Sequence, residues 1–480
     1  MRAKEPDIER CYADAMTMPT HVFREYDIRG VADVDLTDEL VFAIGRALAT
    51  DIRLGAGTPA GETIPIAVAR DCRLSSPRLF AALTQGLMAS GADVIDVGIG
   101  PTPLLYFAAH HLLTNGAVMI TGSHNPAEDN GFKLMRGLGT LFGDAVRALR
   151  ERIERAEYAD GPRGTMSTQD VQPAYIAAVV ASSRFAQSPA ELRVVLDAGN
   201  GSAGPLSLRV FDALGIRVDP MFCDMDGRFP NHHPDPTVEE NLVALRDRVL
   251  STGAQLGIAF DGDGDRVGVI DEAGGVVWGD KLMVLFGREV LAEHPGAAIL
   301  GEVKCSQTLF DDIAKRGGRP IVSRTGHSLI KKRMKEEGAL LAGEMSGHIF
   351  FADRYFGYDD AIYAAVRILE IIAATGKRPG ELLSDVPLTA ATPELRFPCP
   401  DAIKFNVVER VLEHYRGTHE VIDIDGARVL FGEGAWGLCR ASNTGPVLVL
   451  RFEAKTTERL ATIRSEVEAI VAEAIRELGN

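Results

Sequence analysis

Three aspartates stand at every second position in the stretch DGDGDR, residues 261–266, directly after an apolar run. The two glycines between them let the backbone curl, so Asp261, Asp263 and Asp265 can converge on one point. A cluster made only of oxygen ligands suits a hard divalent cation. An EF-hand calcium loop would need glycine where Arg266 stands and helices on both sides, whereas both flanks here have the pattern of strands. A solvated acidic turn would not need both glycines. The stretch therefore predicts a divalent metal site.

A second candidate for chemistry is Ser123 in the stretch TGSHNP, residues 121–126, where it stands directly before His124. Side chains of adjacent residues in an extended or turn segment usually point apart, so we expect His124 to be badly placed as a general base for Ser123. The stretch also lacks the G-x-S-x-G elbow of many hydrolases. A serine hydrolase is therefore the weaker alternative, and His124 is expected to be a neighbouring hydrogen-bond donor.

The stretch CRASNTGP, residues 439–446, has the composition of a phosphate-binding loop between two strands. A guanidinium fork with hydroxyl and amide donors beside it suits a phosphate dianion, and the same residue types also build ordinary tight turns. The donors are Arg440, Ser442, Asn443 and Thr444. Three carboxylates already outweigh the charge of Mg²⁺, so a phosphate near residues 261–266 would also need cations such as Arg266 or Lys133.

Two further stretches could contact a sugar. GEMSGHIFF, residues 343–351, is a glycine-flanked loop whose polar side chains could bind vicinal hydroxyls and exchange a proton. These side chains are Glu344, Ser346 and His348. VFREYDIRG, residues 22–30, offers Tyr26 and Arg29, and on its own it is better explained as an ordinary charged surface strand.

Two motif-like stretches are interpreted as structural. RDCRLSSP, residues 70–77, is expected to start a helix that is capped by Ser75 or Ser76. FPNHHPDP, residues 229–236, is expected to be a proline-rich loop in which the two histidines pack, because no further His or Cys stands at metal-ligand spacing.

The composition limits both the partners and the compartment. The 480 residues carry 51 basic and 67 acidic side chains, a net charge of −16, which argues against nucleic acid or an anionic membrane as partner. Six scattered cysteines without C-x-x-C spacing favour the reducing cytoplasm over zinc or disulfide frameworks. The N-terminal residues lack the apolar core of a signal peptide. The most apolar long stretch, residues 361–376, contains Arg367 and Glu370 and is too short to cross a membrane, so we expect a buried amphipathic helix.

One unit recurs along the chain, at residues 64–98, 192–221 and 297–326: a short apolar strand, a turn, a helix that ends near glycine, and another strand. This alternation predicts three tandem α/β domains with mixed, largely parallel sheets, in which ligands gather at the carboxyl ends of strands. After the proline-rich residues 382–400 the pattern changes to antiparallel strands closed by a helix, which predicts a smaller α+β domain. The expected divisions are an extension at residues 1–20, domain I at 21–166, domain II at 167–276, domain III at 277–387 and domain IV at 388–480.

The motifs TGSHNP, DGDGDR, GEMSGH and RASNT, in this order, resemble those of the alpha-D-phosphohexomutase superfamily, in particular its phosphomannomutase/phosphoglucomutase branch. The similarity runs from FREYDIRG, residues 23–30, to the C-terminus. It implies three similar α/β domains and a smaller C-terminal domain like the TATA-binding protein, arranged around a central cleft. It also implies interconversion of hexose 1-phosphate and hexose 6-phosphate through a phosphoserine and a hexose 1,6-bisphosphate, which is also the expected activator.

The resemblance further implies roles for the residues at matching positions. Ser123, Asp261, Asp263 and Asp265 would hold one Mg²⁺, with the phosphate carried on Ser123. Catalysis would also involve Arg29, His124, Lys133 and His348, the last as a candidate proton carrier. The substrate would contact Tyr26, Arg266, Lys304, His327, Glu344 and Ser346. Its non-reacting phosphate would be held by Arg440, Ser442, Asn443 and Thr444.

Met345 in GEMSGH favours mannose and glucose phosphates, because the similar glucosamine branch usually has glutamine there. The expected partners are therefore small sugar phosphates, and the sequence carries no signal for a particular oligomeric state. A phosphoglucosamine mutase is the alternative within the superfamily. A non-catalytic sugar-phosphate binder is the alternative from another class.

Overall fold

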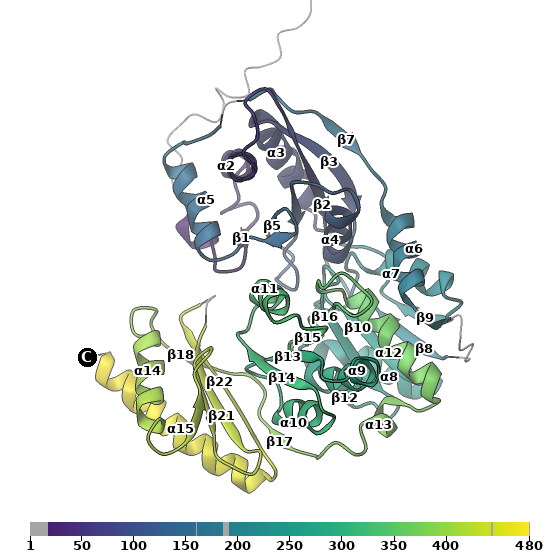
Figure 1. Cartoon of the computed structure of the whole chain (residues 1–480), viewed down its shortest axis with the longest axis vertical. Helices are drawn as coiled ribbons and strands as arrows, with labels where there is room; N and C mark the ends of the chain where they lie inside the picture. The colour runs from purple at the N-terminus through teal and green to yellow at the C-terminus, as the bar shows by residue number, and fades with distance from the viewer. Residues whose placement is uncertain (1–17, 160, 186–191, 443–444, 480) are drawn as a thin grey trace, which may run out of the picture.

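The recurring strand–helix–strand unit is present in all three places where it was expected. The computed structural model describes residues 18–159, 161–185, 192–442 and 445–479. Within them, the two strands of each unit are parallel neighbours. The units are β2 (Ile64–Arg70), α3 (Ser76–Ala89) and β3 (Ala92–Ile99); β8 (Val194–Asp197), α7 (Gly204–Ala213) and β9 (Val218–Met221); and β13 (Ala298–Glu302), α10 (Gln307–Lys315) and β14 (Arg319–Ser323). Three α/β domains and a fourth α+β domain follow one another in an arc (Figure 1), which confirms the expected fold class.

Domain I has a seven-stranded sheet with the order β1-β5-β4-β2-β3-β7, and β6 pairs with β5. The strands β4 (Gly116–Ile120), β2, β3 and β7 (Met166–Thr168) are parallel. The strands β1 (Ile28–Val31), β5 (Asp129–Arg136) and β6 (Gly139–Thr140) are antiparallel to their neighbours. Alternate residues of β2 face opposite layers: Ile66 and Val68 pack with α2 (Asp38–Ala56) and α3, whereas Ala67 and Ala69 pack with α4 (Thr102–His111). The helix α5 is Asp144–Glu154, and a short 3-10 helix, η1 (Thr20–Val22), precedes β1.

Domains II and III repeat this mixed arrangement with fewer strands. The sheet of domain II has the order β12-β11-β10-β8-β9, with β10 (Leu256–Phe260) parallel to β8, and β11 (Val267–Asp271) and β12 (Val276–Val277) antiparallel. The sheet of domain III has the order β14-β13-β15-β16, with β15 (Leu341–Gly343) parallel and β16 (Ile349–Phe351) antiparallel. The other helices are α6 (Gln172–Ser182), η3 (Glu239–Leu242), α8 (Val243–Thr252), α9 (Gly279–Glu293), α11 (His327–Glu337), α12 (Ala361–Thr375) and α13 (Pro379–Leu382).

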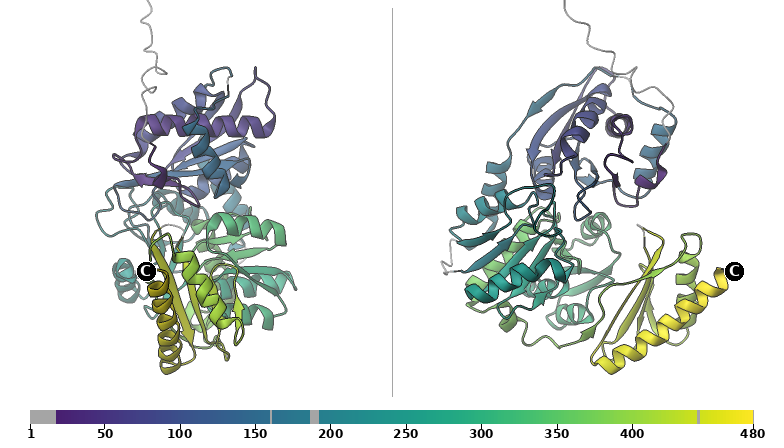
Figure 2. Two further views of the ribbon diagram at one scale, coloured as in Figure 1. Left: turned by 90° about the vertical axis from the view of Figure 1, so that its left-hand side faces the viewer. Right: turned by 180° about the vertical axis from the view of Figure 1, so that it is seen from behind.

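Domain IV is a six-stranded antiparallel sheet covered by two helices. Its core joins Leu450 of the sheet to Val407 and Val467 of the helices. Figure 2 shows the long last helix running along this sheet. The elements are β17 (Ala390–Ala391), β18 (Leu395–Pro398), α14 (Lys404–Tyr415), β19 (Glu420–Ile422), β20 (Ala427–Leu430), β21 (Trp436–Ala441), β22 (Val447–Ala454) and α15 (Thr457–Leu478).

Two of the expected domain boundaries fall inside strands. The division between residues 166 and 167 cuts β7, which still pairs with β3 of the first sheet. The division between residues 276 and 277 cuts β12, because the glycine-containing turn before it is the hairpin turn between β11 and β12 and not a joint. By strand pairing, domain I therefore extends to Thr168 and domain II to Val277.

The apolar stretch expected to be a buried helix forms α12, which packs against α9. Its Arg367 is buried and ion-paired with Asp353 (2.9 Å) and Glu289 (2.7 Å). In the described part of the chain, we find no helix with the length and apolar character needed to cross a membrane.

Domains I, II and III meet at a cluster of aromatic rings around Asp360. This carboxylate stands at the start of α12 and accepts hydrogen bonds from the hydroxyls of Tyr175 of α6 (3.0 Å) and Tyr355 (2.9 Å). The ring of Phe107 on α4 packs edge-on against Tyr175, with 5.6 Å between centroids. Burial raises the pKa of Asp360 to about 6.

The raised pKa predicts a pH dependence of stability. Between about pH 4 and 6 the unfolded chain loses the Asp360 proton while the folded chain keeps it, so the free energy of unfolding falls by about 3 kcal/mol as the pH rises. We expect Asp360→Asn to remove this decline, as measured by urea unfolding at several pH values in that window. Equal pH slopes for the variant and the wild type would contradict the prediction.

Domain IV is attached to domain III through a buried arginine pair. Arg428 of β20 donates to two carbonyl oxygens of the turn at residues 303–305, at 2.5 and 2.9 Å, and its guanidinium lies 3.9 Å from the ring centroid of Trp436. Arg451 of β22 donates to the carbonyl oxygen of Lys304. These hydrogen bonds therefore hold the turn that carries Lys304 against domain IV.

Candidate active site

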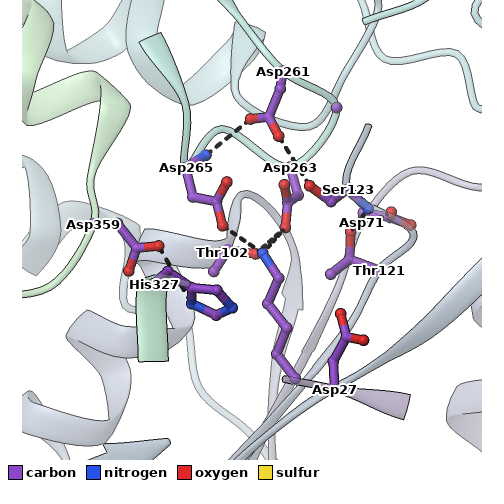
Figure 3. A network of polar contacts seen from close by, with 12 residues as sticks. Asp27, Asp71, Thr102, Thr121, Ser123, Asp261, Asp263, Asp265, His327 and Asp359 are labelled. Atoms are coloured by element: carbon purple, nitrogen blue, oxygen red, sulfur yellow. Dashed lines mark hydrogen bonds and ion pairs between the residues drawn. The ribbon is translucent and has the colours of Figure 1, made fainter. Parts of the chain in front are cut away.

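Ser123 lies in the loop between β4 and β5, and its main chain is left-handed, with φ of 50°. Its Oγ donates a hydrogen bond to Asp261 Oδ2 at 3.0 Å (Figure 3). The N–H of Ser123 donates to Thr121 Oγ1 at 2.8 Å, and the hydroxyl of Thr121 donates to Asp71 Oδ2 at 2.8 Å. These bonds hold the hydroxyl of Ser123 against the carboxylates of residues 261–265.

The structure contradicts the expectation that His124 points away from Ser123. His124 Nδ1 lies 3.2 Å from Ser123 Oγ, because the left-handed main chain at Ser123 turns both side chains to the same side. Burial, with help from Arg266 and Arg29, lowers the pKa of His124 well below its usual value, so its imidazole is neutral. Among the described residues, no carboxylate forms a hydrogen bond to His124 of the kind that orients the base of a hydrolase triad.

Asp261, Asp263 and Asp265 lie in the turn between β10 and β11 and are completely buried. Each offers one oxygen atom, and these three atoms lie within 4.8 Å of one another. One oxygen of Asp263 and one of Asp265 are buried without a hydrogen-bond partner. Burial and the two neighbouring carboxylates raise the pKa of Asp261 well above its usual value. A divalent cation would relieve both conditions, so the donor set fits a metal ion.

Two contacts bring domains I and II together here. A Cβ atom at position 262 would lie 2.4 Å from the carbonyl oxygen of Ser123, so only Gly262 permits the approach of the two loops. Lys133 of β5 places its Nζ 2.6 Å from Asp263 Oδ2 and also contacts Asp265 Oδ2. Burial alone would lower the pKa of Lys133, but these carboxylates raise it above its usual value, so the ammonium stays charged.

The loop between β15 and β16 brings domain III to the site formed by Ser123 and the three aspartates. Glu344 accepts hydrogen bonds from the N–H of Gly326 and from Ser346 Oγ, both at 2.9 Å. Glu344 and Ser346 therefore present a pair of linked polar groups near the start of α11.

His348, on the same loop, has a defined tautomer. Its Nε2 accepts a hydrogen bond from Arg266 Nε at 2.9 Å, so the proton is on Nδ1, which lies 3.1 Å from Asp359 Oδ2. The ring of His327 stacks on His348 with 5.6 Å between centroids. Burial and Lys331 lower the pKa of His327 well below its usual value.

Domain IV contributes Arg440 at the other end of the site, and Lys304 of domain III reaches the same domain. Arg440 is 6% exposed, and its Nε donates to Asp425 Oδ2 at 3.1 Å. Lys304 donates to Glu394 Oε2 at 3.2 Å, in the segment that leads into β18. The predicted donors Asn443 and Thr444 lie outside the described residues.

A cleft of about 410 Å³ collects most of the predicted residues from all four domains. Tyr26, which lines it, donates to the carbonyl oxygen of Thr325 at 2.9 Å, and Arg29 donates to Asn125 Oδ1 at 2.8 Å. Lys304, Ser346 and the three aspartates are not part of this lining. The predicted residues in the lining are Tyr26, Arg29, Ser123, His124, Lys133, Arg266, His327, Glu344, His348, Arg440 and Ser442.

Models of the phosphoglucomutase/phosphomannomutase family match the chain domain by domain. The alpha/beta/alpha domain I model matches residues 20–160, domain II 173–275, domain III 278–389 and the C-terminal domain 394–470. The chain belongs to the phosphoglucomutase/phosphomannomutase family.

Members of this family are similar along nearly the whole chain. A phosphomannomutase/phosphoglucomutase of Pseudomonas aeruginosa is 46% identical over 454 residues, which cover 94% of this chain and 96% of the relative. A phosphoglucomutase of Neisseria gonorrhoeae is 41% identical with the same coverage, 94% and 96%. A crystal structure of a phosphoglucomutase/phosphomannomutase family protein from Burkholderia thailandensis has a TM-score of 0.88 at 40% identity, covering 95% of this chain and 98% of that chain. These findings confirm the resemblance to the phosphohexomutase superfamily and identify the chain as an enzyme of the mutase class.

Three buried residues that the sequence did not single out support this phosphomutase-family site. Thr102 donates to Asp263 Oδ2 at 2.5 Å, Asp359 lies beside His348, and Arg73 donates to carbonyl oxygens of the Ser123 loop. Of these three residues, only Arg73 stands in a stretch that the sequence marks as motif-like, residues 70–77.

The helix cap expected in that stretch is wrong in its detail. The helix α3 begins at Ser76, but neither serine hydroxyl caps it. Ser75 is itself helical in conformation and its Oγ accepts from Asn130, while Ser76 Oγ donates to Asp71 Oδ1 at 2.7 Å. Tertiary partners have therefore replaced the cap.

The histidines of FPNHHPDP are packed, as expected. His232 Nε2 lies 3.0 Å from Asp197 Oδ2, and His233 Nε2 donates to the carbonyl oxygen of His124 at 2.5 Å. The second contact places this loop of domain II against the Ser123 loop of domain I.

Proposed function

We propose that the protein interconverts hexose 1-phosphate and hexose 6-phosphate, of mannose, glucose or both, through phosphorylated Ser123 and a hexose 1,6-bisphosphate. The observation that carries the proposal is the position of Ser123 Oγ, 3.0 Å from Asp261 in a cluster of three buried carboxylates. This pairing suits phosphoryl transfer, which depends on positioning and on neutralising the phosphoryl oxygens. The names of the relatives from Pseudomonas aeruginosa and Neisseria gonorrhoeae support the same reaction.

In the first transfer, the P–Oγ bond of phosphorylated Ser123 breaks while a P–O bond forms to the free hydroxyl of the hexose phosphate. The proton of that hydroxyl passes to His348 Nε2, which carries no hydrogen in the tautomer described above and can accept the proton once Arg266 Nε releases its hydrogen bond. The same proton is then returned to Ser123 Oγ, the leaving oxygen, so a hydroxyl is restored on the enzyme and His348 is neutral again. The second transfer runs in the opposite direction with the other phosphate of the bisphosphate.

Asp261, Asp263 and Asp265 would hold Mg²⁺, which when bound supplies positive charge to the phosphoryl oxygens. Lys133 is a buried cation and Arg266 a half-buried one, and both balance the same charge. Arg29 and His124 line the cleft beside Ser123 and can donate to the phosphate.

The phosphate that does not react would be anchored at the far end of the cleft by Arg440 and Ser442, together with Asn443 and Thr444. An anchor on a separate small domain suits this reaction, because the bisphosphate has to turn end over end between the two transfers. The sugar hydroxyls would replace the contact between Glu344 and Ser346, with Tyr26, Lys304 and His327 around them.

The experiment that tests this function is turnover of mannose 1-phosphate, glucose 1-phosphate and glucosamine 1-phosphate, each with Mg²⁺ and a trace of hexose 1,6-bisphosphate as activator. We expect turnover of the first two and dependence on the bisphosphate whenever Ser123 has lost its phosphate. Preference for the glucosamine substrate would identify the alternative mutase. Binding of sugar phosphates without turnover would indicate a non-catalytic binder, and labelling of Ser123 by a fluorophosphonate probe would favour a hydrolase.

The cytoplasm is the proposed compartment. Of the cysteines that the structure describes, Cys72, Cys223, Cys305, Cys399 and Cys439 are free thiols, which suits a reducing environment.

A further inference from the structure

Arg73 is a buried side chain at the contact between the serine loop and domain II. Its side chain is inaccessible to solvent, although arginine is rarely buried completely. It follows β2 and precedes α3, and its Nε forms an ion pair with Asp71 Oδ2 at 3.1 Å. The ring of Phe229, from domain II, lies 5.1 Å from its guanidinium.

All five N–H groups of the Arg73 guanidinium have acceptors. Besides Asp71, the acceptors are main-chain carbonyl oxygens of residues 123–129, which is the loop that carries Ser123. They are the carbonyl oxygens of Ser123 (2.7 Å), Asn125 (2.7 Å), Pro126 and Asp129 (3.0 Å). A guanidinium supplies five donors in a fixed planar fork, so one side chain defines the position of four peptide groups.

Two glycines beside Arg73 make the space that its side chain and main chain occupy. A Cβ atom at Gly122 would lie 2.5 Å from the guanidinium carbon, and one at Gly227 of domain II would lie 2.7 Å from Arg73 Cα. The carbonyl oxygen of Ser123, which Arg73 holds from one side, also lies against Gly262 of the metal loop. The carbonyl oxygen of Ser123 is therefore confined between Arg73 and Gly262.

We propose that Arg73 is a positioning residue for phosphoryl transfer: by fixing the carbonyl oxygens of residues 123–129, it holds Ser123 in its left-handed conformation and aligns the phosphate for attack. The proposal rests on the proposed function of Ser123 as phosphate carrier. It predicts an effect on the rate of transfer and not on the affinity for substrate, because the groups proposed to anchor the substrate, Arg440 and Ser442, lie in domain IV.

The test compares Arg73→Lys with Arg53→Lys. Lysine keeps the charge but offers only three donors, so at least two acceptors of Arg73 lose their partner. Arg53 is a matched control, because it is 3% exposed and donates to the carbonyl oxygens of Pro59, Glu62 and Gly91 in the same domain, away from the cleft. The readouts are kcat and KM, the thermal unfolding midpoint, and amide hydrogen exchange of the peptide containing residues 121–130.

For Arg73→Lys we expect kcat to fall about 100-fold with KM changed by less than about threefold, which is the loss expected from a displacement near 1 Å. Exchange should rise within residues 121–130. For Arg53→Lys we expect a similar loss of thermal stability with kcat within about twofold of the wild type. Equal changes in kcat for the two variants, or unchanged exchange at residues 121–130 in Arg73→Lys, would overturn the proposal.

The test still gives an answer if the variant does not fold or if the wild-type protein shows no turnover. If Arg73→Lys does not fold, Gly122→Ala carries the same test, because its methyl group displaces the guanidinium while Arg73 remains. If the wild-type protein turns over no hexose phosphate, the proposed function fails, and hydrogen exchange still decides whether Arg73 fixes the loop.

Discussion

Replacing Ser123 with alanine should abolish mutase turnover. We expect kcat to fall by about 10⁴-fold or more, the scale seen when a covalent carrier is removed. His124 lies 3.2 Å from Ser123 Oγ but its imidazole is neutral and half-buried, and no other hydroxyl in the described cleft lies against Asp261. Affinity for hexose phosphate should change little, because Arg440, Ser442 and Glu344 remain in place.

A coupled assay measures the loss of turnover, and intact-mass analysis measures the loss of a labile phosphate after incubation with hexose 1,6-bisphosphate. Ser207→Ala is the control, since its hydroxyl is equally buried but donates to a carbonyl oxygen within α7. A labile phosphate on the Ser123→Ala protein would place the phosphoryl carrier elsewhere.

Removal of Mg²⁺ should have the second largest effect. We expect a chelator to abolish turnover and added Mg²⁺ to restore it, because three buried carboxylates then face the phosphate without a neutralising cation. Asp261→Asn should lower kcat by about 10³-fold and weaken Mg²⁺ binding at least about tenfold. Asp271→Asn is the control, since that carboxylate accepts bonds from the N–H groups of Ala273 and Gly275 in the β11–β12 turn.

Mg²⁺ binding should also depend on pH in a defined direction. The raised pKa of Asp261 means that the metal-free protein holds a proton there up to a higher pH than an ordinary carboxyl, and Mg²⁺ must displace this proton. Affinity should therefore fall as the pH is lowered through that pKa. Titration calorimetry in two buffers of different ionisation enthalpy counts the released proton. If Asp261→Asn bound Mg²⁺ with wild-type affinity, or if Mg²⁺ bound to the wild type without releasing a proton, Asp261 would not be the protonated metal ligand.

The features that the sequence predicted depend on residues close together in the chain. The repeated strand–helix–strand unit gave the three α/β domains, and DGDGDR gave the buried aspartate cluster, because alternating carboxylates and glycines act within one turn. The boundary at residue 166 fell inside β7, since its pairing with the distant strand β3 leaves no local mark. The boundary at residue 276 fell inside β12, since a glycine-containing hairpin turn has the composition of a domain joint.

The features that the sequence missed depend on the main chain or on distant partners. His124 approaches Ser123 only because of the φ angle at Ser123, which residue type does not reveal. Arg73 binds carbonyl oxygens, which every residue possesses, so its targets have no sequence signature. Ser75 has the residue type of a helix cap but accepts from Asn130, which stands 55 positions later.

The left-handed conformation of Ser123 has a consequence for which hydroxyl amino acid can stand there. Threonine has the same nucleophile and can be phosphorylated, but its branched Cβ makes a φ of 50° a steric outlier. A change to threonine, often treated as conservative, would have to rotate the peptide away from Arg73 and from Gly262. The geometry of this loop therefore restricts the position to the unbranched alcohol.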